Sequence, residues 1–304
     1  MIVVVGETLT DRVRRPDGTT NDHPGGGPFN TARTIGRLGQ PVQLATVIGN
    51  DERGQLCLAE LAESRVDTSL VQRNELPTTL ALATLNAAGS ASYEFDFESS
   101  AARQLSDLRL PSDTTFLHVG TLALVLEPFA TAVQAAIDSL SDNVALLVDP
   151  NCRPSVVRDV PAFLGHVAAA IARADVVKLS DDDLAYLREL DGQFPDPATL
   201  IERGISCVLF TRGSSGVDVI GPWGSQTIAA PSVVVADTVG AGDSLTGAFL
   251  AWWSKNRLTR DDLSNRDCVV AATSFAVHVA ALTVSVAGAN PPTMAKLLAA
   301  YPAL

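Results

Sequence analysis

Short apolar segments alternate with amphipathic ones along most of this chain, and this alternation constrains the fold more than any other feature. Several of the apolar segments have no polar interruption, which is typical of parallel strands covered by helices on both faces. The predicted strands are Ile2–Val5, Val42–Ile48, Phe116–Val119, Val144–Asp149, Val176–Leu179 and Val208–Thr211. The helices predicted between them are Phe29–Leu38, Gly54–Ser64, Pro128–Leu140, Pro161–Ala172 and Asp182–Leu190. The pattern predicts a doubly wound α/β fold with a mostly parallel sheet, which binds ligands at the carboxyl ends of its strands.

Two parts of the chain depart from this alternation. Leu80–Asn86 and Ser92–Phe97 are typical of antiparallel strands on either side of Ala87-Ala-Gly-Ser90, and the polar segment Arg12–His23 contains Pro16-Asp-Gly18. We expect a small β-sheet lid built from about residues 11–24 and 78–100, on a single domain spanning residues 1–304. Surface decoration without a function is the alternative. Nearer the C-terminus the pattern predicts a hairpin, Val217–Ile220 with Ser225–Ala229, and two helices, Asp267–Thr283 and Thr293–Ala300.

The composition limits the partners of this chain. Its 304 residues carry a formal net charge of −12, which argues against nucleic acid as a partner. The lysines are Lys178, Lys255 and Lys296, and no Gly-Lys-Ser or Gly-Lys-Thr sequence occurs, so the lysine-containing phosphate loop is excluded. The four cysteines lie far apart in the sequence and form no Cys-x-x-Cys pair, so neither a zinc site nor a disulfide framework is expected.

No segment has the pattern of a membrane span or a secretion signal. The nearest candidate for a span, Cys268–Ala289, contains His278 and many small polar residues, and we expect it to be a buried helix. The first residues, Met1-Ile-Val-Val-Val-Gly-Glu, have no basic region and no cleavage site, so we expect a core strand there. A cytoplasmic protein is the resulting expectation.

The segment Asp237-Thr-Val-Gly-Ala-Gly-Asp243 directly precedes an apolar helical run. A glycine-rich turn at a helix start leaves backbone N–H groups unpaired, and with the helix dipole they form a site for a phosphate or a developing oxyanion. A carboxylate there would repel an anion, unless its task is to accept a proton from a hydroxyl that attacks a bound phosphoryl group. The alternative is that Asp243 only caps the helix.

Two separated segments resemble the signatures of the PfkB (ribokinase-like) family of carbohydrate kinases. The first runs from Gly25-Gly-Gly-Pro-Phe-Asn30 to Gly39, and the second is Asp237–Asp243. Between them, Asp149–Arg153, Lys178–Asp183 and Thr211–Gly216 fall in the order of the family, so the resemblance covers essentially the whole chain. It implies a ribokinase-like three-layer α/β/α sandwich with a small β lid. It also implies an ATP- and Mg²⁺-dependent transfer of the γ-phosphoryl group to a primary hydroxyl of a sugar.

The resemblance also implies roles for individual residues. Asp243 would be the catalytic base, and the N–H groups of Gly240, Ala241 and Gly242 would hold the charge of the migrating phosphoryl group. The residues that would bind the sugar are Asp11, Gly26, Gly27, Asn30 and Arg153. Two alternatives stay open: Asp11 could be a solvated turn residue, and Arg153 could contact the γ-phosphate or pair with Asp149.

A further set of residues would bind the nucleotide and cations. By the resemblance, the nucleotide would lie against Ser180, Thr211, Gly213, Gly216, Val277 and Gly288. A plain hairpin turn is the alternative for Thr211–Gly216. Ser180 and Asp183 stand where the family usually has Asn-x-x-Glu, so Asp183 would reach Mg²⁺ through water, or Asp181 or Asp182 would take its place. A helix capping box is the alternative. A monovalent cation such as K⁺ would bind near Asp237 and the Ala287–Ala289 turn.

The sequence Gly-Gly-Gly-Pro-Phe-Asn resembles the fructokinase form of the first signature, which favours fructose or a related ketose as the acceptor. 2-Keto-3-deoxygluconate and a nucleoside are alternative acceptors on the same chemistry. A non-catalytic nucleotide-binding sensor would gain nothing from Asp243, and Gly6–Asp11 lacks the Gly-x-Gly-x-x-Gly sequence of a nicotinamide dehydrogenase. The strand edge at Ser92–Phe97 would allow a homodimer through the lid, and we expect His118 to be a packed strand residue.

Overall fold

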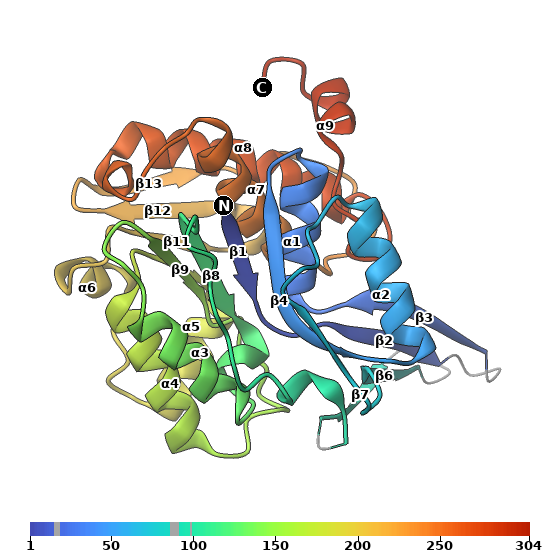
Figure 1. Cartoon of the computed structure of the whole chain (residues 1–304). Helices are drawn as coiled ribbons and strands as arrows, with labels where there is room; N and C mark the ends of the chain where they lie inside the picture. The colour runs from blue at the N-terminus through green and yellow to red at the C-terminus, as the bar shows by residue number, and fades with distance from the viewer. Residues whose placement is uncertain (15–18, 86–90, 98) are drawn as a thin grey trace.

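The structure is a computed structural model of the chain and describes residues 1–14, 19–85, 91–97 and 99–304. Its middle layer is a nine-stranded sheet in the order β13-β12-β11-β10-β9-β8-β1-β4-β5 (Figure 1). All pairings from β11 to β5 are parallel, whereas β12 and β13 join one edge as an antiparallel hairpin. The strands are β1 (Ile2–Val5), β4 (Val42–Gly49), β5 (Val71–Asn74), β8 (Phe116–Gly120), β9 (Ala145–Asp149), β10 (Val176–Ser180), β11 (Cys207–Thr211), β12 (Val217–Gly221) and β13 (Gly224–Ile228).

Helices cover both faces of this sheet, and the alternation of side chains along each strand explains why. In β1, Val3 and Val5 lie in one apolar cluster, whereas Ile2 and Val4 lie in another on the opposite face. The first cluster is closed by α3 (Phe129–Asp138), α4 (Val160–Arg173), α5 (Asp181–Leu190) and α6 (Pro197–Glu202). The second is closed by α1 (Gly27–Arg37), α2 (Glu52–Glu63), α7 (Ala241–Lys255), α8 (Arg266–Val284) and α9 (Met294–Ala300). The predicted fold class is therefore confirmed.

Two elements escaped the sequence prediction. The edge strand β5 has the sequence Val-Gln-Arg-Asn and is half exposed, so it carries no apolar run. The helix α6 spans six residues, Pro197–Glu202, which is too short for a helical period to be recognised. Apolar periodicity finds elements that are buried along their length, and it misses short or edge elements that the neighbouring strand completes.

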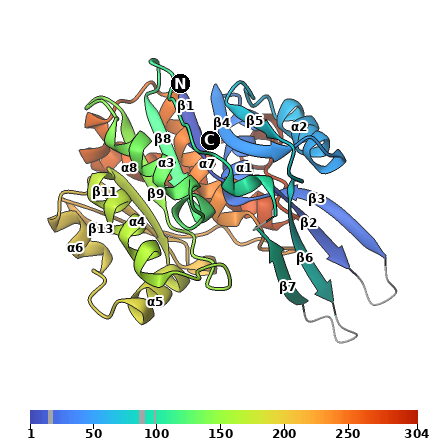
Figure 2. The ribbon, with the colours of Figure 1, turned by 60° about the horizontal axis from the view of Figure 1, so that its bottom comes forward.

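A second, four-stranded sheet projects from the main sheet in the order β3-β2-β6-β7, and Figure 2 shows it standing away from the helical layers. Its strands are β2 (Leu9–Arg14), β3 (Thr20–Gly25), β6 (Thr79–Leu85) and β7 (Ala91–Asp96). The pairs β2–β3 and β6–β7 are antiparallel, but β2 and β6 pair in parallel, which the sequence did not indicate. The turn sequences at 16–18 and 87–90 lie outside the described residues. We call this four-stranded sheet the lid.

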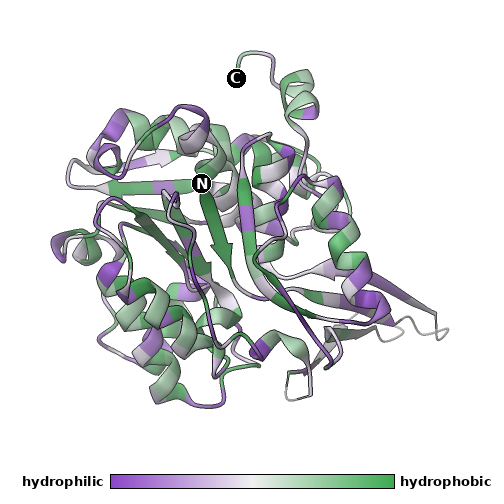
Figure 3. Cartoon of the chain, in the orientation of Figure 1, coloured by the Kyte–Doolittle hydropathy of each residue, from purple (hydrophilic) through white to green (hydrophobic). Residues whose placement is uncertain are grey.

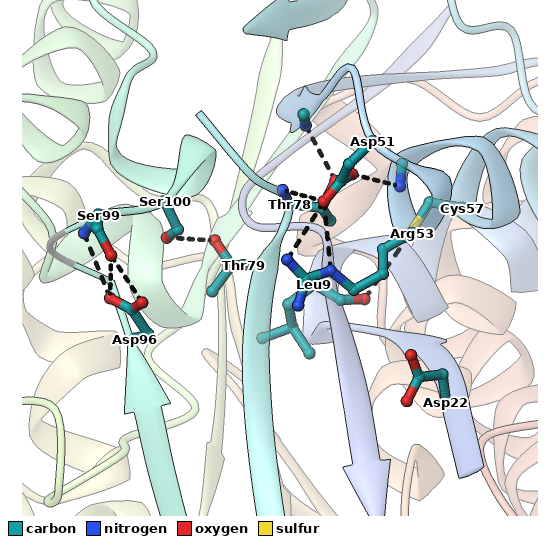
Figure 4. Close-up of polar contacts among 12 residues, drawn as sticks. Leu9, Asp22, Asp51, Arg53, Cys57, Thr78, Thr79, Asp96, Ser99 and Ser100 are labelled. Carbon is teal, nitrogen blue, oxygen red and sulfur yellow. Dashed lines mark hydrogen bonds and ion pairs between the residues drawn. The ribbon is translucent and has the colours of Figure 1, made fainter. Parts of the chain in front are cut away.

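The lid differs from the main sheet in its surface character. In Figure 3 the central strands around β1 are hydrophobic, whereas β3 is mainly hydrophilic. Polar contacts fix the base of the lid to the main body (Figure 4). Asp51, the N-cap of α2, accepts hydrogen bonds from the Thr78 N–H (3.0 Å) and the Thr78 hydroxyl (2.6 Å) and also from the Gly54 N–H. The Thr79 and Ser100 hydroxyls lie 2.7 Å apart at the other end of the base.

One helix, α8, is long and apolar enough to cross a membrane by length and composition alone. Half of its most apolar window is buried within the protein. Val269, Phe275 and Val279 of this helix lie in the apolar cluster on the α1 and α7 face. This location agrees with the predicted buried helix.

His118 is a packed strand residue in β8, and neither of its buried ring nitrogens has a hydrogen-bond partner among the residues that the structure describes. Burial lowers the pKa of His118 to about 3, and the nearby Lys178 adds to this effect. The unfolded chain takes up a proton as the pH falls through about 6.5, but the folded chain does not, so stability is lost between pH 6.5 and 3.

Replacing His118 by Leu should therefore remove a source of acid sensitivity. We expect a gain of about 1–2 kcal/mol in the free energy of unfolding at pH 8, because two orphaned polar atoms disappear, and a larger gain at pH 5. Urea unfolding at both pH values measures this. The control is His278→Gln, at a ring that is bonded to the Ser274 carbonyl. Equal gains at both pH values would contradict the titration argument.

Candidate active site

The candidate site lies at the carboxyl ends of β1, β8 and β9, beside the first turns of α1 and α7. Glu7 follows β1, Thr121 follows β8 and Asn151 follows β9. Parallel strands end at one edge of a sheet, so residues distant in sequence meet there. Asn30 in α1 and Asp243 in α7 complete the group.

The Asp243 carboxylate points toward this group. Asp243 is 8% exposed, and its Oδ2 accepts a hydrogen bond from the Asn30 side-chain amide (2.9 Å). Its Oδ1 lies 3.4 Å from the Asn151 side-chain amide. The N-cap of α7 is Gly240 and makes no side-chain capping bond. The geometry thus argues against the alternative that Asp243 only caps its helix.

The turn before α7 presents free backbone donors. Gly240 has a φ of 77°, in the left-handed region that favours glycine. Within the described part of the chain, the N–H groups of Gly242 and Asp243 have no hydrogen-bond partner. The Ala241 N–H is instead directed at the Thr238 carbonyl (3.3 Å), so this predicted donor is engaged within the turn. Among the described residues, the predicted donors Gly240 and Gly242 therefore have free N–H groups, Ala241 does not, and the Asp243 N–H is an additional free donor.

Two residues beside Asp243 have strained backbones. Thr121 has a φ of 54° and Asn151 a φ of 40°. The left-handed region is unusual for a β-branched residue such as Thr, and each such residue costs about 1–3 kcal/mol. The Asn151 amide donates to the Thr121 hydroxyl (3.2 Å) and thereby joins the two turns. Such strain persists where the surrounding contacts fix it, and it is concentrated at functional sites.

Glycines allow close approach around this group. A Cβ at Gly27 would lie 2.8 Å from the Thr121 hydroxyl oxygen, 3.0 Å from Asn151 Nδ2 and 3.3 Å from Asp243 Oδ1. Gly27 therefore lies at the centre of the site. Gly26 has a φ of 111°, and a Cβ there would lie 2.6 Å from the Glu7 carbonyl oxygen. The positive φ and the nearby Glu7 carbonyl thus require glycine at position 26, whether or not Gly26 contacts a ligand.

The lid brings Asp11 to the same site. Asp11 lies in β2 opposite His23, and its Oδ2 would lie 2.3 Å from a Cβ at Gly25. Burial raises the pKa of Asp11 to about 6, with His23 and Arg153 opposing and Asp243 adding to the rise. Burial also raises the pKa of Asp243, against the Asn30 hydrogen bond and the charges of Arg153 and Lys178. The solvated-turn alternative for Asp11 does not fit these surroundings.

Arg153 is exposed, and its side chain donates hydrogen bonds to the preceding residues of the turn after β9. One of its guanidinium nitrogens donates to the Asn151 carbonyl (3.0 Å), the Asn151 side-chain oxygen (2.7 Å) and the Cys152 carbonyl (3.1 Å). It does not pair with Asp149, one of the alternatives that the sequence left open, because Asp149 is paired with Lys178. Burial raises the pKa of Glu7, Asp11 and Asp243, and the charge of Arg153 opposes this rise at all three carboxyls.

A buried ion pair lies beneath the free donors. Lys178 Nζ is 3.1 Å from Asp149 Oδ1, and both side chains are 4% exposed. A Cβ at Gly242 would lie 3.1 Å from Lys178 Nζ, so the ammonium group lies directly against the turn. Burial alone would lower the pKa of Lys178, but Asp149 and Asp183 raise it above its ordinary value. The sequence excluded a lysine phosphate loop, and tertiary structure supplies a lysine from β10 instead.

Ser180 and Asp183 form a helix capping box. The Ser180 hydroxyl accepts from the Asp183 N–H (3.0 Å), while Asp183 Oδ2 accepts from the Ser180 N–H (3.0 Å) and hydroxyl (2.6 Å). Asp183 Oδ1 accepts from the Cys152 N–H (2.6 Å). Asp183 is only 4% exposed. These contacts favour the capping alternative over the predicted water-mediated metal ligand.

The predicted nucleotide residues do not form one cluster: Thr211, Gly213 and Gly216 lie at the end of β11 and in the turn that follows it, whereas Val277 lies in α8. Thr211 ends β11. Gly213 and Gly216 have positive φ angles of 51° and 94°, and a Cβ at Gly216 would lie 2.1 Å from the Ile228 carbonyl oxygen. Gly216 is therefore required by the β12–β13 hairpin, while Gly213 is in open space. Val277 is buried in the apolar core, so it is not a surface that could flank an adenine.

Asp237 joins the turn before α7 to the turn after α8. Its carboxylate accepts from the Val239 N–H (3.0 Å) and the Gly288 N–H (2.9 Å). A Cβ at Gly240 would lie 2.6 Å from Ala289 Cβ, which places the two turns in contact. The predicted cation residue and the predicted nucleotide residue Gly288 therefore lie together, as the resemblance implied.

Four residues of the site were not predicted from the sequence: Glu7, Thr121, Asn151 and Lys178. Three of them follow a predicted strand, so their positions at strand ends could have indicated them. The strain at Thr121 and Asn151 and the approach of Lys178 to Gly242 have no sequence signal.

The fold and the site together define a class of protein. A buried carboxylate, unpaired N–H donors at a helix start and a β-sheet lid lie at the carboxyl edge of a doubly wound sheet. This arrangement suits a phosphotransferase that acts on a hydroxyl group of a small molecule.

The chain belongs to the pfkB family of carbohydrate kinases, whose family model matches residues 1–296. It is 32% identical over 276 residues to a fructokinase from Rhizobium leguminosarum bv. trifolii, covering 88% of this chain and 84% of that protein. A fructokinase from Vibrio alginolyticus is 29% identical over 301 residues, covering 97% of each. The crystal structure of a Vibrio cholerae fructokinase with fructose, ADP and calcium ion has a TM-score of 0.84 at 26% identity, covering 98% of this chain and 97% of that one.

Proposed function

We propose that this chain is an ATP-dependent fructose kinase that transfers the γ-phosphoryl group to a primary hydroxyl of the sugar. The carrying observation is the Asp243 carboxylate, held by two side-chain amides directly beside the unpaired N–H groups of Gly242 and Asp243. Relatives that bear the name fructokinase support fructose as the acceptor.

In the proposed mechanism, Asp243 accepts the proton of the sugar hydroxyl, while the oxygen of that hydroxyl forms a bond to the γ-phosphorus. The bond from the γ-phosphorus to the β–γ bridging oxygen breaks, and that oxygen keeps the electron pair and leaves on ADP. Asp243 then releases its proton to water. The N–H groups at the start of α7 and the ammonium of Lys178 stabilise the negative charge on the moving phosphoryl group. Asn30 and Asn151 orient the Asp243 carboxylate.

The described residues contain no group of three or more His, Cys, Asp or Glu side chains placed to hold a metal ion. Mg²⁺ in nucleotide sites is held largely by phosphates and water with one or two carboxylates. We therefore propose that Mg²⁺ enters with ATP, where it would neutralise phosphate charge, and we assign it no protein ligand. K⁺ near Asp237 stays a proposal too, supported by a Vibrio cholerae fructokinase double mutant solved with potassium ion.

A panel of acceptors tests the function. ATP consumption would be measured with fructose, ribose, 2-keto-3-deoxygluconate and adenosine, with and without Mg²⁺ and K⁺. Fructose should give the highest kcat/KM. Preference for 2-keto-3-deoxygluconate would instead assign the exposed Arg153 to a substrate carboxylate. If the protein binds ATP but turns over none of these acceptors, the result would support the alternative function, a non-catalytic nucleotide-binding sensor.

Replacing Gly27 by Ala tests the acceptor side of the site. The added methyl group would lie 2.8 Å from the Thr121 hydroxyl, inside the space proposed for the sugar. We expect the KM for fructose to rise by about tenfold or more, while the KM for ATP changes less than about twofold. Gly165→Ala, at a helical position with open space, is the control. An unchanged fructose KM would place the sugar elsewhere.

Two further proposals concern the whole protein. We propose that it acts in the cytoplasm as a single kinase domain, and that two copies pair through the edge of the lid at β7. The argument for pairing is that β7 is an edge strand, with unpaired backbone groups along one side. Light scattering tests the dimer.

A further inference from the structure

Glu7 is a fully buried carboxyl that the proposed reaction does not use. It lies in the connection from β1 to β2 and is 1% exposed. Burial raises the pKa of Glu7 to about 8, against the backbone hydrogen bonds that it accepts and the charge of Arg153, and no ion pair joins Glu7 to a described cationic residue. A buried carboxyl without a cationic partner is costly, so its retention calls for a reason.

The contacts of Glu7 are backbone amides on the acceptor side of the site. Oε1 accepts a hydrogen bond from the Gly27 N–H (3.0 Å), and Oε2 accepts one from the Leu122 N–H (3.2 Å). Gly27 begins α1, and Leu122 directly follows the strained Thr121. One carboxyl group thus fixes two segments whose sequence positions are about a hundred residues apart, at the point where both reach the site.

Both segments are in contact with the group around Asp243. A Cβ at Gly27 would lie 2.8 Å from the Thr121 hydroxyl oxygen and 3.3 Å from Asp243 Oδ1. The Thr121 hydroxyl accepts from Asn151, whose amide also reaches Asp243. A φ of 54° at a β-branched residue is not maintained by local preference, so a contact at the next residue has to hold it.

We propose that Glu7 is a positioning residue for the acceptor: its carboxyl group holds Gly27 and the Thr121–Leu122 turn together, so that the Thr121 hydroxyl and the Asn151 amide face the sugar beside Asp243. This inference rests on the proposed function. Glu7 touches no substrate atom in this scheme and acts through the two backbone segments. Among the described residues, no hydrogen bond joins the Glu7 side chain to the turns at Gly213 and Gly288, which are proposed to form the nucleotide side of the site.

The principal test is Glu7→Gln, which keeps the shape of the side chain but replaces one acceptor oxygen by an N–H₂ group facing an N–H. We expect the KM for fructose to rise at least tenfold, because one of the two backbone segments is released. The KM for ATP should stay within about twofold. Direct titration calorimetry of fructose should show the same weakening without turnover. Glu7→Asp, which keeps both carboxyl oxygens but is one methylene shorter, should fall between Gln and the natural residue.

The matched control is Asp175→Asn. Asp175 is also a buried carboxylate that accepts a backbone N–H, from Leu146, but it lies at the opposite end of the strands. The Asp175→Asn variant should have a lower Tm, with unchanged KM values for fructose and ATP. If Glu7→Gln lowers Tm in the same way and leaves fructose binding within twofold, Glu7 is only structural and the inference is wrong.

A second variant covers the case in which Glu7→Gln does not fold. Thr121→Ala removes the hydroxyl that Glu7 is proposed to position, and it should raise the KM for fructose without affecting ATP. An unchanged fructose KM in Thr121→Ala would also overturn the inference. If the natural protein does not phosphorylate fructose at all, the proposed function fails first, and calorimetry with the acceptor that it does use then tests Glu7 separately.

Discussion

Replacing Asp243 by Asn is expected to lower kcat by about 10²- to 10⁴-fold, the range for loss of a general base. The amide keeps the size of the side chain but cannot accept the proton of the acceptor hydroxyl. The KM for fructose should change little, because a general base acts in the transition state and contributes little to binding of the sugar. ATP should bind at least as tightly, since a negative charge beside its phosphates is removed. Steady-state kinetics and nucleotide titration measure these effects.

The control for this variant is Asp267→Asn. Asp267 also lies in the first turn of a long helix, α8, but its side chain is 90% exposed. If first-turn acidic residues mattered only through the helix dipole, the two variants would behave alike. A fully active Asp243→Asn enzyme would remove the base from the proposed mechanism.

Replacing Lys178 by Met is expected to affect both stability and catalysis. It leaves Asp149 buried without its partner, and breaking such a pair costs about 3–5 kcal/mol. The variant also removes the ammonium that lies against Gly242, so we expect kcat to fall at least about tenfold. Burial raises the pKa of Asp243 and Lys178 is one of the charges that oppose this rise. Without Lys178 the pKa rises further, and activity should be lost at a higher pH on the acid side.

The double variant Asp149→Asn/Lys178→Met separates the two effects. It contains neither charge, so most of the lost stability should return, as measured by denaturant unfolding. The low kcat and the shifted acid limb should remain, because the cation is still missing. If the double variant had the natural pH profile and turnover, the Lys178–Asp149 pair would contribute to stability only, and the proposed catalytic role of Lys178 would be wrong.

The lid shows which structural features the sequence pattern can predict and which it cannot. Its strands were predicted at about the right places because alternation and turn residues mark antiparallel strands. The order of the strands in the lid was not predicted. The strands β2 and β6 pair in parallel across a separation of about seventy residues, and no local pattern encodes such a long-range partner. The same limit applies to β5, which is polar and becomes a strand because β4 offers it an edge.

Local motifs gave mixed results at the site. Ser180 and Asp183 were assigned to the nucleotide and the metal by resemblance, yet their mutual hydrogen bonds make a capping box, a purely local structure. Val277 was assigned to the adenine and lies in the core instead. Gly27, Asn30 and Asp243 do meet, although more than two hundred positions separate the first from the last.

The amino-acid order alone determined the layered α/β class, the buried helix near the C-terminus and the glycine turn ahead of a carboxylate. These depend on periodicity and on backbone freedom at glycine, which act over a few residues. The three-dimensional packing alone decided that Lys178 lies under Gly242, that Glu7 joins Gly27 to Leu122, and that Thr121 is held in a strained conformation. Burial and contact between distant segments create those environments, because the cost of a buried charge or a strained residue is offset only where several strand ends converge.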